Sequence, residues 1–95
     1  MPTISKQLAA LLRTEPATAA LSAILEERAR QESRFHIQVR PAGEWSQIIT
    51  ALTGELARAI LEQNAPAIDH ALTQIGATAA AALEDNRATP PTPTP

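Results

Sequence analysis

Apolar side chains recur at the 3.6-residue spacing of an α-helix through the middle of the chain. Their stripe consists of Trp45, Ile48, Ile49, Leu52, Leu56, Ala59 and Ile60. It covers about four turns of one helix face and predicts a helix from about Gly43 to Gln63. No run of β-branched residues alternates for long, and the chain has only three glycines. These features predict an all-α fold.

Prolines and turn residues divide the rest of the chain into further helices. Pro16 behind Thr14 is typical of a helix start, whereas Pro41 is typical of a break. Asn64 followed by Pro66 predicts a cap and the first turn of a last helix. The helices are therefore expected at about residues 4–13, 15–35, 43–63 and from 66 onward. Because the last break is short, the last two helices should form an antiparallel hairpin.

The predicted architecture is a bundle of three main helices plus a short N-terminal helix, in one domain. This domain covers residues 1–87 with its core at about 15–86, and residues 88–95 (ATPPTPTP) form a disordered tail. The apolar face of the second helix contains Leu21, Ile24, Leu25, Arg28, Glu32 and Phe35. The apolar face of the last helix contains Ile68, Ala71, Leu72, Ile75, Ala79 and Leu83.

The hydrophobic residues of this chain predict a thin core. They make up 44% of the sequence, but aromatic residues make up only 2%, and much of the remainder is alanine. Since alanine buries little area, we expect oligomerisation to complete the core. A face of small residues on the last helix (Gly76, Ala77, Ala80 and Ala81) is expected either to contact a second subunit or to be a solvated helix surface.

Charge and cysteine content limit the classes of function. A net charge of −2 with mixed signs gives no reason to expect DNA binding. The absence of cysteine rules out disulfides and thiolate zinc sites. No apolar run reaches the roughly 20 residues of a membrane span, and the first residues do not read as a signal peptide, so a cytoplasmic protein is expected.

Three stretches resemble a known family in their order and spacing. They are ILEERARQESRF, EWSQIITALTGELARAILEQ and IDHALTQIGATAAAALE. They are similar to the MazG-like all-α nucleotide pyrophosphohydrolases, in particular the short phage and bacterial branch, over about residues 24–84. In that family, acids in the patterns E-E-x-x-E and E-x-x-D hold Mg²⁺ between two adjacent helices. The metal neutralises phosphate charge and orients the attacking water.

The resemblance fails at the positions that would carry the metal. The first two acids fall on Ala51 and Leu52, and the E-x-x-D positions fall on Ala71 and Gln74. Glu55 matches the third acid and is the one carboxylate that remains. Because a single carboxylate is a poor site for Mg²⁺, we expect the metal site to be lost and no cofactor to be required.

Several other side chains are candidates for ligand binding. Arg30 and Gln31 match an R-Q step of the family, where a basic residue can meet a phosphate. Arg28 and Glu32 lie within an apolar stripe, so they either face a polar pocket with Glu55 or pair with each other and reach water. Glu55 itself is either part of such a site or a solvated acid at the rim of its helix stripe. The predicted ligand-binding set is Arg28, Arg30, Gln31, Glu32, Glu55 and Gln74.

The sequence thus favours a MazG-like pseudoenzyme that binds a nucleotide-type ligand or a protein partner without catalysis. One alternative is an active Mg²⁺-dependent nucleoside triphosphate pyrophosphohydrolase with relocated ligands. That enzyme would use Glu55 and Glu62, with Glu26, Glu27 or Asp69 as further ligands. Another alternative is a structural or regulatory oligomer without a small-molecule ligand.

Overall fold

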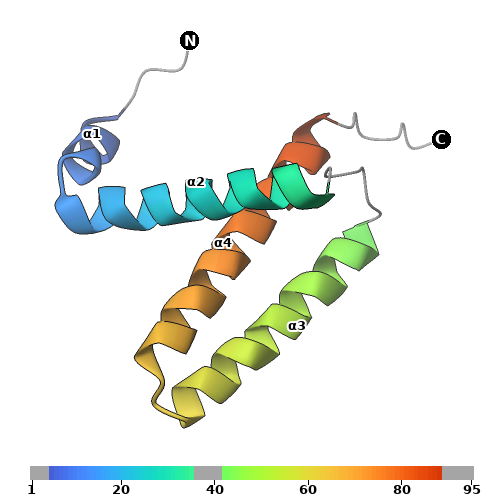
Figure 1. The fold of residues 1–95 in the computed structure, drawn as a ribbon. Helices are drawn as coiled ribbons and strands as arrows, with labels where there is room; N and C mark the ends of the chain where they lie inside the picture. The colour runs from blue at the N-terminus through green and yellow to red at the C-terminus, as the bar shows by residue number, and fades with distance from the viewer. Residues whose placement is uncertain (1–4, 36–41, 89–95) are drawn as a thin grey trace.

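The computed structural model describes residues 5–35 and 42–88, which form four α-helices (Figure 1). They are α1 (Lys6–Leu12), α2 (Glu15–Phe35), α3 (Ala42–Leu61) and α4 (Ala65–Ala88). This confirms the predicted all-α bundle of three main helices plus a short N-terminal helix. The predicted break at residues 36–41 and nearly all of the predicted tail, residues 89–95, lie outside the described residues.

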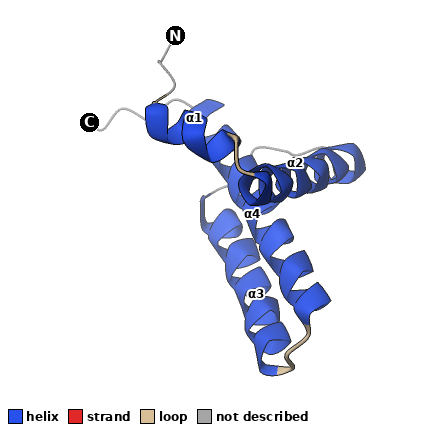
Figure 2. Cartoon of the chain, turned by 90° about the vertical axis from the view of Figure 1, so that its left-hand side faces the viewer, coloured by secondary structure: helices blue, strands red, loops and turns tan. Residues whose placement is uncertain are grey.

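Helix α4 is the central element of the fold. It packs against α3 in an antiparallel hairpin and against α2, which crosses it steeply (Figures 1 and 2). Helix α1 packs only against α2, and α2 and α3 make no packing contact within the described residues. Among the described residues, any site shared by α2 and α3 would therefore have to include α4.

The turn between α3 and α4 is defined by local hydrogen bonds. The backbone N–H of Asn64 donates to the carbonyl of Ala59 (3.0 Å), and that of Gln63 donates to Ile60 (3.0 Å). Gln63 has a φ of 53°, so the pattern is a Schellman motif closed by a residue other than glycine. The side chain of Asn64 then accepts a hydrogen bond from Ala67 N (3.1 Å), which confirms the predicted N-cap.

The interior of this molecule is built mainly from alanine. The buried hydrophobic side chains among the described residues are Trp45, Ala59, Ala71, Ala77 and Ala81. Ala77 is completely buried at 0% exposure. Small side chains at these positions let α2 and α3 approach α4 closely, and the core is thin as expected.

The predicted apolar faces of α2 and α4 are only partly correct. Leu72 and Leu83 of α4 remain 51% and 52% exposed, and Leu21 and Leu25 of α2 are also exposed. The small-residue face, by contrast, lies inside the chain: Ala77 and Ala81 are buried, and a Cβ built on Gly76 would lie 2.8 Å from Ile24 Cδ1. The face expected to meet a second subunit or water is thus the one that packs within the chain.

Gly76 and Gly54 provide a matched test of this close approach. Gly76→Gln should lower the free energy of unfolding by about 1–3 kcal/mol, because the new side chain meets Ile24 of α2. Gly54→Gln should raise it by about 0.5–1 kcal/mol, because nothing lies within 4 Å of the added Cβ and a helical glycine is lost. Urea unfolding of both variants measures the difference. Equal effects at both positions would contradict the α2–α4 packing.

No single helix within the described residues is long and apolar enough to cross a bilayer. Helix α1 and residues Glu15–Ser33 meet that length and composition only as a pair bent by 83°.

Candidate functional site

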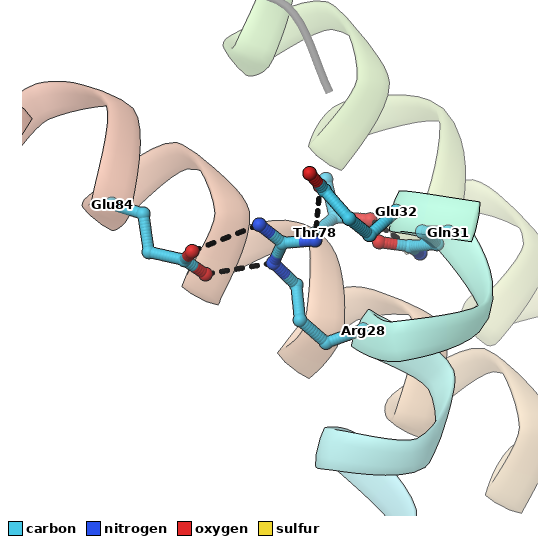
Figure 3. A network of polar contacts seen from close by, with 5 residues as sticks. All are labelled: Arg28, Gln31, Glu32, Thr78 and Glu84. Atoms are coloured by element: carbon cyan, nitrogen blue, oxygen red, sulfur yellow. Dashed lines mark hydrogen bonds and ion pairs between the residues drawn. The ribbon is translucent and has the colours of Figure 1, made fainter. Parts of the chain in front are cut away.

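Arg28 is the centre of the polar contacts between α2 and α4. Its Nε and Nη2 donate to the two carboxylate oxygens of Glu84 at 2.7 and 2.8 Å, and its Nη1 donates to Glu32 at 2.9 Å (Figure 3). The Arg28 side chain is only 15% exposed, so the guanidinium is largely withdrawn from water and held by two carboxylates. The bidentate geometry fixes the orientation of α2 on α4.

The two members of this ion pair shift each other's pKa. Hydrogen bonding to Glu84 raises the pKa of Arg28, against the opposing effect of its burial. Hydrogen bonding from Arg28 lowers the pKa of Glu84. Both groups are therefore charged at neutral pH, and the bridge is complete there.

Two further contacts lie beside this bridge on the same helices. Gln31 Nε2 lies 3.5 Å from the hydroxyl of Thr78, which is buried on α4 (Figure 3). Glu27 is buried as well and pairs with Arg30 one turn further along α2. The α2–α4 crossing therefore combines alanine packing with a polar cluster, which we define as Arg28, Gln31, Glu32, Thr78 and Glu84.

Trp45 of α3 contacts α4 at the same end of that helix as the Arg28–Glu84 bridge. Its Nε1 donates a 2.8 Å hydrogen bond to Asp85 Oδ2 of α4, and the indole is buried between α3 and α4. A tryptophan buried in this way, with its N–H paired, serves as a packing anchor. It also ties the start of α3 to the last turns of α4.

The sequence-predicted site residues are divided between different parts of the fold. The polar cluster contains three of them, Arg28, Gln31 and Glu32, while Arg30 pairs with Glu27 one turn earlier on α2. Glu55 and Glu62 are exposed and make no ion pair within the described residues. Gln74 is half-buried on α4. The two carboxylates that hold Arg28 are Glu84 and Glu32, so Arg28 has no direct ion pair with Glu55.

The acids named for the relocated metal site do not meet in one place. Across residues 5–35 and 42–88, no group of three or more histidine or acidic side chains is arranged to hold a metal ion. Of the acids named for the relocated metal site, Glu27 is buried against Arg30, while Glu26, Glu55, Glu62 and Asp69 are exposed.

Glu84 and Thr78 are the site members that the sequence did not predict. Glu84 falls on α4 about five turns after Ala65, and no local pattern relates it to Arg28 on another helix. The available signal is Arg28 itself: a charged residue inside an apolar stripe requires a partner of opposite charge.

A second feature of the surface is an open groove of about 390 Å³ where α2 and α4 diverge. It is lined by Pro16, Ala19, Ala20, Ala23, Ile24, Asp69, Leu72 and Thr73. The lining is mainly apolar and has one acidic and no basic side chain. This composition suits apolar side chains better than a phosphate group.

The pH dependence of stability tests the Arg28–Glu84 bridge. Because the pKa of Glu84 is lowered in the folded state, its contribution is complete above the unfolded-state pKa and is lost as pH falls through the folded-state pKa. Glu84→Gln should therefore lower the free energy of unfolding at neutral pH, by under about 1 kcal/mol because Glu84 is largely exposed. The difference from wild type should disappear in acid.

Glu62→Gln is the matched control, because this exposed carboxylate makes no ion pair in the described part of the chain. A difference between Glu84→Gln and wild type that persists unchanged in acid would contradict an ionic role for Glu84.

The fold and the polar cluster define an all-α helical bundle whose second and fourth helices are joined through Arg28. No known protein-family description, no curated protein and no solved structure matches the chain. The MazG-like resemblance therefore stays a prediction from the sequence.

Proposed function

We propose that this protein is a non-catalytic helical module that functions by associating with further copies of itself. The observation that carries this proposal is the exposure of its large apolar side chains. Nine leucine and isoleucine side chains of the described residues are 41% to 85% exposed, while no large side chain there is fully buried. They are Leu8, Leu11, Leu12, Leu21, Leu25, Ile60, Leu61, Leu72 and Leu83.

Energetics favour covering these side chains. Burying apolar surface contributes about 25 cal/mol per Å², and complete burial of one leucine contributes about 1.5–3 kcal/mol. An alanine core gains little from the same effect. The free energy from apolar burial in the folded monomer therefore exceeds the conformational entropy cost of folding by only a small amount.

The polar cluster supports a structural role more than ligand binding. Arg28 and Arg30, which the sequence assigns to a nucleotide-type ligand, each hold a carboxylate of the chain itself. An incoming phosphate would have to displace Glu84 from a bidentate pair. The geometry therefore favours association, in line with the oligomeric alternatives from the sequence.

Thermal unfolding as a function of protein concentration tests this function. Because association stabilises only the folded state, the Tm should rise steadily with concentration over the micromolar range. A Tm that is independent of concentration would contradict the proposal. The same assay with nucleoside triphosphates and Mg²⁺ tests the alternatives: a shift abolished by Arg28→Gln would favour ligand binding, and pyrophosphate release lost in Glu55→Ala would favour the enzyme.

A further inference from the structure

Helix α4 carries an apolar stripe that neither α2 nor α3 covers completely. It consists of Ile68, Leu72, Ile75, Ala79 and Leu83, at the spacing of one helix face. Its two leucines are half exposed, Ala79 is exposed, and the isoleucines are half-buried. We call these five residues the α4 stripe. No charged side chain interrupts it.

Two opposite charges lie along one edge of the α4 stripe. Asp69 and Arg87 are about five helical turns apart, since roughly 18 residues at 3.6 per turn separate them, so they share one side of α4. Both side chains are exposed, and neither makes an ion pair within the described residues. The negative charge lies near the start of α4 and the positive charge near its end.

The charged pair and the leucine pair have nearly the same midpoint along α4. The midpoint between Asp69 and Arg87 lies at Thr78, and the midpoint between Leu72 and Leu83 lies between Ala77 and Thr78. A twofold axis at this level, perpendicular to α4, would place Leu72 of one copy opposite Leu83 of the other. The same axis would place Asp69 opposite Arg87 of the second copy.

We propose that the α4 stripe is the docking surface for a second copy of this chain, with the two α4 helices antiparallel about a twofold axis at Ala77–Thr78. This inference rests on the proposed self-association and specifies its interface and register. The contact is isologous, because each copy presents the same stripe. Two Asp69–Arg87 pairs border it and favour the antiparallel register, since a parallel pair of α4 helices would place the two charged edges on opposite sides of the contact, where no Asp69–Arg87 pair can form.

Charge reversal in trans tests this register. Asp69→Arg alone and Arg87→Asp alone each create two like-charge contacts, so each variant should dimerise about tenfold more weakly at low ionic strength. An equimolar mixture of the two variants should regain wild-type affinity, because every contact across the heterodimer then joins opposite charges. High salt should reduce all of these differences. Sedimentation velocity measures each affinity.

Arg58→Asp provides the control for the single reversals. Arg58 lies in the last turn of α3, away from the α4 stripe, so Arg58→Asp alone should dimerise as tightly as the wild type. A wild-type dimer whose affinity is insensitive to both reversals, or is not restored in the mixture, would overturn the interface but leave self-association intact. A monomeric wild-type protein would overturn both, and a different protein would then be the partner for the stripe.

Discussion

We expect Trp45→Ala to lower the free energy of unfolding by about 3–5 kcal/mol, the largest effect of any single truncation in this fold. Trp45 is the only large side chain among the buried hydrophobic residues described, and the alanines around it cannot fill the space it would leave. Its loss would also remove the 2.8 Å hydrogen bond to Asp85 that ties α3 to α4. Since small domains unfold with a free energy of about 5–15 kcal/mol, the variant would lose much of its free energy of unfolding.

Trp45→Phe separates packing from hydrogen bonding in this prediction. Phenylalanine retains most of the apolar contact and loses the donor to Asp85, so we expect a loss of about 1–3 kcal/mol. Urea unfolding monitored by circular dichroism measures both variants, because it does not depend on tryptophan fluorescence. A Trp45→Ala variant no less stable than Trp45→Phe would contradict the account of the core.

The second large effect concerns association. Leu72→Asp combined with Leu83→Asp should weaken dimerisation at least about 100-fold, because four leucine side chains per dimer lose their burial and charges enter an apolar contact. Both leucines are half exposed in the monomer, so the helical fold should be retained. Circular dichroism checks the fold, and sedimentation velocity measures the affinity.

Leu61→Asp is the matched control for that double variant. Leu61 is the most exposed of the large apolar side chains that the structure describes, at 85%, but it lies at the end of α3 and outside the α4 stripe. Its substitution should leave the dimer intact. If it dissociates the dimer as strongly as the double variant does, association uses a broader surface than the α4 stripe.

The helices were predictable because their signals are local. The 3.6-residue period from Trp45 to Ile60, the start at Pro16 and the cap at Asn64 depend only on neighbouring residues, and the structure agrees with each. The antiparallel hairpin of α3 and α4 followed from the short connection between them.

The packing faces were harder to predict because they depend on how helices cross. Hydrophobicity predicts Leu72 and Leu83 in the core and Gly76 and Ala77 on a face that meets either a second subunit or water. In the structure, the small residues are inside, since they allow the backbones of α2 and α4 to approach closely. A sequence pattern identifies the apolar face and the small-residue face of one helix, but it does not say which of the two packs within the chain.

The candidate site shows the same limit. Arg28 was recognisable as a charge within an apolar stripe, but its main partner, Glu84, is 56 residues further along the chain. Only the α2–α4 crossing brings the two together. Glu55, which the family resemblance singled out, is exposed on a helix that makes no packing contact with α2 in the described structure.

The central claim is that this chain associates with itself, and its mass in solution tests that claim most directly. Sedimentation equilibrium of the wild-type protein across the micromolar range should give a mass that rises from one chain of 10.1 kDa toward twice that value. A mass of one chain at every concentration would contradict the account.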